Sequence, residues 1–236
     1  MIRTYDTCGR DIIMKIEDGR DNLYEIVDKQ ILSHWTQYDN NHIRLSIDIA
    51  IKCMEQNMSE LNGNCKYAHD PEGKVVFSPY NTVEYSIFLY YLSHDLYKAG
   101  HEKEASLVYY LNKIMNSVEW FYAIELPVHF WADHPLGSVL GRATYGDYLF
   151  VNQGVTVGGN SIGVLNDVYP TIGKNVHLCA GSSLIGDCHI GDNSVIAAGT
   201  FIRNQDVPAN SIVYGISPNI VIKEKKNNEH IRPLWG

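Results

Sequence analysis

Aliphatic residues return at every sixth position between residues 172 and 202 of this 236-residue chain. Neither the 3.6-residue period of a helix nor the two-residue period of a strand produces a strict six. A six-residue repeat is typical of a parallel β-helix, where each hexad forms one face of a coil and its aliphatic side chain stacks inside. The aliphatic positions are Ile172, Leu178, Leu184, Ile190, Ile196 and Ile202, and the small or β-branched residues four positions further on are Val176, Ser182, Cys188, Ser194 and Thr200.

The same period begins less regularly upstream. Val139 opens it, Val151 and Val157 keep its phase, and residues 163–170 interrupt it as an insertion. Alternating apolar and polar residues over 123–131 predict a strand before the first hexad. We therefore expect a left-handed β-helix of roughly four coils over residues 121–222, followed by a charged tail over residues 223–236.

The first half of the chain has a different period. Apolar residues spaced three and four apart predict four amphipathic helices, which pack as a bundle or provide an oligomer contact. Their expected ranges are 21–35, 40–63, 83–98 and 103–120, with a short extended piece at 75–77. The resulting fold class is α+β, with a helical domain over residues 1–120 followed by the β-helix.

Composition narrows the function. A net charge of −8 argues against a nucleic-acid partner or an anionic membrane surface. No run of 18 apolar residues is present, so no membrane span is expected, and the polar N-terminus does not resemble a signal peptide. Five cysteines without a CxxC pair fit reduced thiols, and the expected location is cytoplasmic.

Three motifs then carry a family resemblance. Residues 133–141 read Asp-His-Pro-Leu-Gly-Ser-Val-Leu-Gly, residues 154–159 read Gly-Val-Thr-Val-Gly-Gly, and residues 169–173 read Tyr-Pro-Thr-Ile-Gly. This series resembles the serine acetyltransferases and related hexapeptide-repeat O-acetyltransferases over residues 85–222. The resemblance implies acetyl transfer from acetyl-CoA to a hydroxyl, in a homotrimer or a dimer of trimers, at a site between neighbouring subunits.

Residue roles follow from that resemblance. His134 matches the catalytic general base, and histidine suits this role because it titrates near neutral pH. Asp133 matches a position that contacts the acceptor, and Glu125 is the nearest equivalent of the carboxylate that orients the base. The residues that match the family's acetyl-CoA positions are Gly159, Ala180 and Ala198, and Lys223 or Lys225 could meet the nucleotide phosphates.

The acceptor is where the sequence departs from the family. Tyr169 stands where serine acetyltransferases carry a histidine that helps hold the substrate carboxylate, and residues 163–168 contain no Lys or Arg. A neutral phenol carries no positive charge, so we expect a carbohydrate acceptor from a capsule, a lipopolysaccharide or a precursor sugar. Aromatic rings suited to stacking on a sugar are Trp131, Tyr145, Tyr148, Phe150 and Tyr169.

Other functions stay open. Serine itself is the first alternative as acceptor. A β-helical zinc lyase would need three histidines, and His129 and His134 could supply only two at a plausible separation, so no metal is expected. A non-catalytic scaffold would not need the Asp133-His134 motif.

Overall fold

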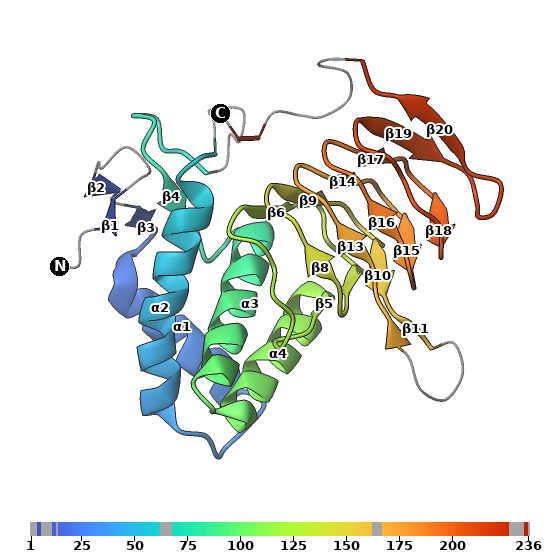
Figure 1. Ribbon diagram of the computed structural model, residues 1–236. Helices are drawn as coiled ribbons and strands as arrows, with labels where there is room; N and C mark the ends of the chain where they lie inside the picture. The colour runs from blue at the N-terminus through green and yellow to red at the C-terminus, as the bar shows by residue number, and fades with distance from the viewer. Residues whose placement is uncertain are drawn as a thin grey trace. The chain divides into compact units, whose positions relative to one another are not determined.

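The computed structural model describes residues 4–5, 11–12, 14–61, 68–161, 167–226 and 234–235. The chain forms two compact units, residues 1–116 with 233–236 and residues 117–232. The division falls slightly before the expected boundary at 120/121. The reason is that Glu119–Trp120 already form strand β5 of the second unit (Figure 1).

The helical unit contains the four expected helices. They are α1 (Gly19–Leu32), α2 (Asn40–Met58), α3 (Thr82–Lys98) and α4 (Glu102–Asn116). Asp39 and Asn81 cap α2 and α3, because each side chain accepts hydrogen bonds from two backbone N–H groups of the first turn. Helix α4 ends earlier than the expected residue 120, since Ser117 turns into the left-handed region at φ 54°.

Short strands complete this unit. Strand β1 (Thr4–Tyr5) pairs antiparallel with β2 (Asp11–Ile12), and β3 (Lys15–Ile16) pairs parallel with β4 (Val76–Phe77). Strand β4 confirms the extended piece expected at 75–77. Phe77 is fully buried there and packs against Phe88 of α3, with ring centroids 5.3 Å apart.

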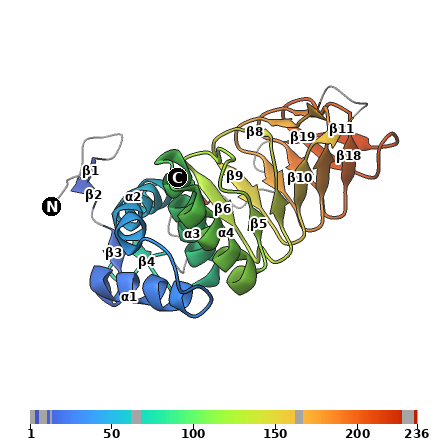
Figure 2. The same ribbon diagram turned by 90° about the horizontal axis from the view of Figure 1, so that it is seen from below.

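The described residues of the second unit, 117–161 and 167–226, form a parallel β-helix of three sheets, whose strands stack as successive rungs (Figures 1 and 2). Sheet I contains β5, β7 (Val139–Leu140), β10 (Thr156–Gly158), β15 (Ser183–Ile185) and β18 (Phe201–Arg203). Sheet II contains β8 (Thr144–Tyr145), β13 (Thr171–Ile172) and β16 (His189–Ile190). Sheet III contains β6 (Phe130–Ala132), β9 (Leu149–Val151), β14 (His177–Leu178), β17 (Val195–Ile196), β19 (Ser211–Tyr214) and β20 (Val221–Glu224).

The chain visits the three sheets in a fixed order, so its turns form three edges. The III–I edge contains the turns from sheet III to sheet I, and the I–II and II–III edges are named in the same way. Each turn of the regular coils joins two strands of different sheets. Residues on one edge of successive coils therefore lie above one another.

The register confirms the hexapeptide prediction. Leu184 pairs with Ile202, and Leu178 pairs with Ile196, so each aliphatic residue stacks on the third one after it and a coil consists of three hexads. The six aliphatic hexad residues are at most 3% exposed, because they stack inside the coil. The small residues four positions further on, Val176, Ser182, Cys188, Ser194 and Thr200, are also buried.

The predicted insertion is a hairpin on the I–II edge. Strand β11 (Asn160–Ser161) pairs antiparallel with β12 (Asp167–Val168), and residues 162–166 of the insertion lie outside the described residues. Val157 still pairs with Leu184, although the insertion makes their separation in the sequence longer than that of a regular coil. The insertion therefore leaves the stacking of the coils intact.

Two other expectations need correction. The strand expected over 123–131 is replaced by an irregular segment, and only Phe130–Ala132 is extended. The tail expected from residue 223 onward begins inside a strand, because β20 pairs antiparallel with β19 and closes sheet III. The backbone N–H of Lys225 continues this order by donating to the carbonyl of Asn210.

Candidate functional site

The edges of the β-helix separate the candidate site residues into groups. Asp133 and His134 lie on the III–I edge, together with Ala180 and Ala198 of later coils. On the I–II edge lie Gly159 and Tyr169, whereas Tyr148 lies on the II–III edge. Trp131 and Lys223 belong to sheet III, and Glu125 is exposed in the segment before β6. A single chain therefore does not gather all of them at one place.

His134 is an exposed member of the III–I group. Its side chain is 79% exposed, and its Nε2 lies 3.7 Å from Oδ1 of Asp133. The residue has a left-handed backbone, with φ 49°, directly before Pro135. Such a conformation is uncommon for a bulky residue and must be held by its surroundings. The imidazole therefore projects from a constrained turn with a carboxylate beside it.

Hydrogen bonds tie this turn to the next two coils. The backbone N–H of Asp133 donates to the Val151 carbonyl at 2.9 Å, and the Asp133 carbonyl accepts from Nδ2 of Asn152 at 3.4 Å. Oδ1 of the same Asn152 lies 2.8 Å from Nε2 of His177. Burial lowers the pKa of His177 to about 4, against an opposing effect of the Asp133 charge. His177 is thus a neutral hydrogen-bonding group at neutral pH.

The I–II edge carries a second polar pair. Nη1 of Arg142 donates to the Tyr169 hydroxyl at 3.2 Å, and the guanidinium carbon lies 6.0 Å from the centre of the Tyr169 ring. That ring lies against Gly159, where an added Cβ would come within 2.6 Å of Tyr169 Cε1. The Tyr169 phenol is therefore accompanied by a positive charge. Arg142 lies outside residues 163–168, which contain no Lys or Arg.

The expected aromatic cluster does not form a stacking surface. Trp131, Tyr145 and Phe150 are 6%, 8% and 7% exposed. Tyr148 stacks on His129 with ring centroids 4.7 Å apart. The burial of the first three rings corrects the expectation that they offer faces to a sugar.

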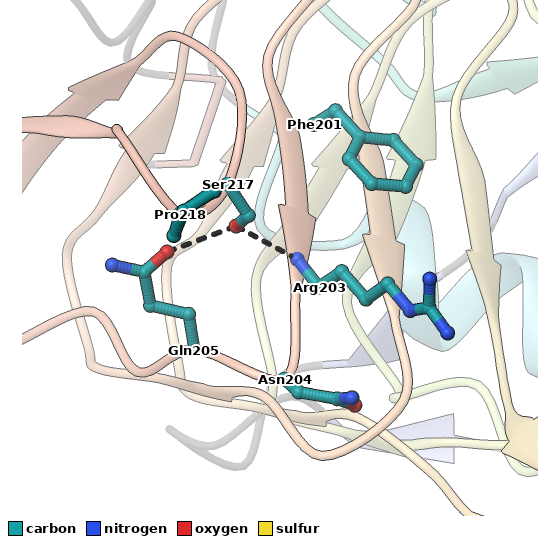
Figure 3. Close-up of a pocket in the computed structure, with 6 residues that line it drawn as sticks. All are labelled: Phe201, Arg203, Asn204, Gln205, Ser217 and Pro218. Atoms are coloured by element: carbon teal, nitrogen blue, oxygen red, sulfur yellow. Dashed lines mark hydrogen bonds between the residues drawn. The ribbon is translucent and has the colours of Figure 1, made fainter. Parts of the chain in front are cut away.

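A pocket of about 330 Å³ lies on the last coils of the β-helix (Figure 3). Phe201 and Arg203 of β18 form one side, and the hydroxyl of Ser217 accepts from the Arg203 backbone N–H at 3.0 Å. The same hydroxyl donates to Oε1 of Gln205 at 2.9 Å. The other lining residues are Asn204 and Pro218. This pocket lies where sheet I meets the I–II edge and carries an exposed guanidinium.

Lys223, the candidate for the nucleotide phosphates, lies elsewhere. It belongs to β20 of sheet III, and its Nζ lies 5.3 Å from the centre of the Tyr214 ring. Lys225 is half-buried and donates from Nζ to the Asn193 carbonyl at 3.1 Å. Both lysines are therefore held against sheet III and the II–III edge, whereas Gly159 and Arg203 are associated with sheet I.

Metal ligation finds no support in the part of the chain that the structure describes, where no group of three or more His, Cys, Asp or Glu side chains is placed to hold an ion. His129 and His134 lie on different edges, and Nδ1 of His129 instead lies 2.9 Å from Oδ2 of Asp147. Among the described helices, none is long and apolar enough to cross a membrane.

Sequence comparisons identify what this architecture is similar to. Residues 169–204 match the model of the bacterial transferase hexapeptide, six repeats. A serine acetyltransferase of Synechococcus elongatus is 32% identical over 133 residues, which cover 56% of this chain and 54% of that protein. A serine acetyltransferase of Staphylococcus epidermidis is 30% identical over 141 residues, covering 59% of this chain and 65% of that protein. The chain thus spans between about half and two thirds of the length of these curated relatives.

Solved structures agree on the fold. The serine acetyltransferase of Vibrio cholerae superposes with a TM-score of 0.67 at 19% identity, covering 88% of this chain and 80% of that one. The enzyme of Brucella abortus, solved in complex with coenzyme A, gives 0.65 at 22% identity, covering 88% and 84%. The enzyme of Neisseria gonorrhoeae, solved in complex with serine, gives 0.61 at 24% identity, covering 86% and 90%. The chain carries the hexapeptide repeat of bacterial transferases and has the fold of the serine acetyltransferases, a helical unit followed by a left-handed β-helix.

Proposed function

We propose that this protein is an acetyl-CoA-dependent O-acetyltransferase with His134 as its general base. The observation that carries the proposal is the exposed imidazole of His134 on a constrained turn, with Asp133 beside it, in a β-helix shared with enzymes solved with coenzyme A and with serine. A hydroxyl is a weak nucleophile and needs a base when it attacks. Glu125 remains a proposed orienting partner of His134.

The chemistry follows from the position of that base. His134 accepts the proton of the acceptor hydroxyl as the oxygen attacks the thioester carbonyl, which forms the tetrahedral intermediate. Collapse of the intermediate breaks the carbon–sulfur bond. The imidazolium then returns its proton to the departing thiolate, so coenzyme A leaves as the thiol and the acetyl group remains on the acceptor oxygen. Asp133 stands beside this base, with its Oδ1 3.7 Å from Nε2 of His134.

A complete site of this kind needs two chains. His134 lies on the III–I edge, and Arg142 and Tyr169 lie on the I–II edge of the same β-helix. A site that uses both groups requires the III–I edge of one copy to face the I–II edge of another. A repeated contact between two different surfaces closes a ring when its rotation is a whole fraction of a turn, and a homotrimer is the ring that suits a three-sided β-helix. A dimer of trimers through the helical unit is a further possibility of the same proposal.

Acetyl-CoA would lie along this shared groove. Ala180 and Ala198 on one edge and Gly159 on the other leave room for the pantetheine arm to approach the backbone. We place the nucleotide phosphates at Arg203 rather than at Lys223, because Arg203 lines an open pocket next to the I–II edge (Figure 3). A guanidinium is well suited to phosphate oxygens because it donates from a planar fork.

L-serine is the acceptor that we favour. Arg142 places a guanidinium at the Tyr169 hydroxyl, and such a group can hold the carboxylate of an amino acid. The expectation of a neutral sugar relied on the absence of positive charge at this position, and Arg142 removes that reason. The named relatives reported above are serine acetyltransferases.

A carbohydrate acceptor is the second candidate. Tyr169 supplies a phenol in place of the family histidine, and its ring is half-buried rather than buried. A sugar hydroxyl would use the same base and the same donor. The burial of Trp131, Tyr145 and Phe150 leaves this candidate with less support than serine.

Coenzyme A release tests both candidates directly. Purified protein would be incubated with acetyl-CoA and either L-serine, neutral sugars or an acidic capsular polysaccharide, while the free thiol is followed by a colorimetric reagent. Turnover with serine supports the favoured acceptor, and turnover with a glycan alone supports the second. If neither acceptor gives more thiol than His134→Ala protein, the proposed O-acetyl transfer is wrong. Light scattering on the same sample tests the trimer.

A further inference from the structure

The turn that presents His134 is bonded to the side chain of Asn152, which is bonded in turn to His177. His134 has φ 49°, and left-handed backbone is unfavourable for an L-residue. Such a conformation persists where the surrounding structure over-determines it. Asp133, the preceding residue, is bonded at both of its backbone groups to the second coil, through its N–H to Val151 and through its carbonyl to Asn152.

The amide of Asn152 connects this carbonyl to His177. Its Nδ2 donates to the Asp133 carbonyl, so its Oδ1 accepts from Nε2 of His177. The opposite orientation of the amide would put two acceptor oxygens against each other at Asp133. The proton of the neutral imidazole is therefore on Nε2, and the three residues form a single directional chain of donors.

The rest of the His177 ring supports this arrangement. Nδ1 is buried and has no hydrogen-bond partner within the described structure. A proton on Nδ1 would be buried without an acceptor, so the imidazole stays neutral and keeps its single proton on Nε2. The Phe150 ring meets the imidazole edge to face at 4.5 Å, which fixes its orientation. His177 thus acts as a fixed, uncharged donor towards Asn152.

We infer that His177 and Asn152 form a positioning relay, which holds the Asp133–His134 turn in the conformation that presents the imidazole of His134 to the acceptor. This inference rests on the proposed role of His134 as base. His177 and Asn152 are positioning residues, because neither needs to touch a substrate. The relay reaches across three coils, since His177 lies on the third, Asn152 on the second and Asp133 on the first.

Substitutions at His177 separate donor chemistry from ring shape. His177→Phe keeps a flat ring and removes the donor, whereas His177→Gln keeps an N–H donor at the end of the side chain. We expect His177→Phe to lower kcat by about tenfold to a hundredfold, because a small displacement of a catalytic group is costly. The KM for acetyl-CoA should stay unchanged. His177→Gln should retain most of the turnover.

Asn152 gives a second, independent test. Asn152→Ala removes both hydrogen bonds and should lower kcat as much as His177→Phe. Asn152→Asp can still accept from His177 but cannot donate to the Asp133 carbonyl, so it should also lose turnover. His189→Phe is the matched control, because His189 is an exposed histidine of sheet II whose Nδ1 lies near Asp206 rather than near the turn.

One readout does not depend on activity. Amide hydrogen exchange at Asp133 reports how firmly the turn is held, because this N–H donates to Val151. Exchange should rise at least tenfold in His177→Phe and stay near the wild-type value in His177→Gln. Faster exchange in a protein that never transfers acetyl would refute the proposed function and leave the relay standing.

Three results would overturn the relay. One is wild-type kcat in both His177→Phe and Asn152→Ala. Another is equal loss in His177→Phe and His177→Gln at unchanged melting temperature, since the ring and not its donor would then matter. The third is unchanged exchange at Asp133 in every folded variant. If His177→Phe does not fold, the Asn152 variants decide the question.

Discussion

The regular coils after Ile172 and the first coils before it place different residues at the corners where the backbone is left-handed. In the regular coils, asparagine takes the left-handed corner of the II–III edge, at Asn175, Asn193 and Asn210, with φ between 54° and 58°. In the first coils, bulkier residues do so, with His134 at φ 49° on the III–I edge and Tyr148 at φ 60° on the II–III edge. Asparagine tolerates this region far better than tyrosine.

Coil length differs in the same way. The regular coils repeat at three whole hexads, as the pairing of Leu184 with Ile202 shows. In the first coils, Trp120 pairs with Leu140 and Ala132 pairs with Val151, and neither separation in the sequence is a whole number of hexads. Strain and irregular spacing thus gather in the coils that carry His134. The regular coils serve as a rigid support, and the cost of the irregular coils is consistent with a functional demand on their geometry.

The largest expected effect belongs to the strained histidine itself. His134→Ala should lower kcat by about 10²–10⁴-fold, because a positioned base contributes about that much. The fold should persist, since the His134 side chain is 79% exposed and packs against little. Steady-state kinetics and a melting curve check the two parts. His189→Ala, in a regular coil, should leave kcat unchanged. Activity retained in His134→Ala would show that His134 of the first coils is not the general base.

The pH dependence of stability should report the buried histidine of the regular coils. The folded pKa of His177 is about 4, below the ordinary value of 6.5, because the imidazole is buried. Between these values the unfolded chain takes up a proton that the folded protein does not. Stability contributed by His177 is therefore complete above pH 6.5 and falls by about 1.4 kcal/mol per unit as the pH drops towards 4.

Urea unfolding of wild-type protein and His177→Gln at several pH values measures this contribution. Burial raises the pKa of Glu84 in the helical unit to about 8, so its contribution changes in the opposite direction, with stability falling as pH rises from 4.5 to 8. That effect is common to both proteins and cancels in their difference. A difference that is flat from pH 7 to pH 4.5 would contradict the buried, neutral state of His177.

Sequence reasoning reached the architecture but missed several groups that the structure brings to the proposed site. The strict hexad predicts the stacked aliphatic core because each position acts through its own coil. The hexad pattern does not predict the contact between Asn152 and His177. The two residues are 25 apart in the sequence and meet only because β9 pairs with β14. The pattern does not predict the contact between Arg142 and Tyr169 either, because the two residues are 27 apart in the sequence with the insertion between them. Trp131 and Phe150 occupy outward positions of sheet III, where alternation alone predicts exposure.

Substitution of Arg142 tests whether the first coils bind the carboxylate of the acceptor. Arg142→Leu should raise the KM for serine and lower kcat/KM by about tenfold or more, because a hydrogen bond to a charged group contributes about 1.5–3 kcal/mol. The KM for acetyl-CoA should change little. Arg203→Leu is the matched control and should show the reverse, with a higher KM for acetyl-CoA. An unchanged KM for serine in Arg142→Leu would favour the carbohydrate acceptor.

The smallest expected effect comes from the regular coils. Asn193 lies in the middle of an asparagine ladder, where Nδ2 of Asn175 donates to its Oδ1 at 2.9 Å and its own Nδ2 donates to Oδ1 of Asn210 at 3.2 Å. Asn193→Ala removes both bonds and leaves an alanine at φ 58°, so we expect a loss of about 1–2 kcal/mol in the free energy of unfolding. Urea unfolding measures the loss.

Asn193→Gly separates the two causes of that loss. It also breaks the ladder, but glycine adopts the left-handed region without strain, so this variant should lose less than Asn193→Ala. Neither variant should change kcat by more than about twofold, because Asn193 lies on the II–III edge and is not bonded to His177 or Asn152, which hold the turn of His134. A large fall in kcat at Asn193, with the fold retained, would mean that the asparagine ladder also sets the geometry of the base, and the distinction between a supporting ladder and the His177–Asn152 relay would fail.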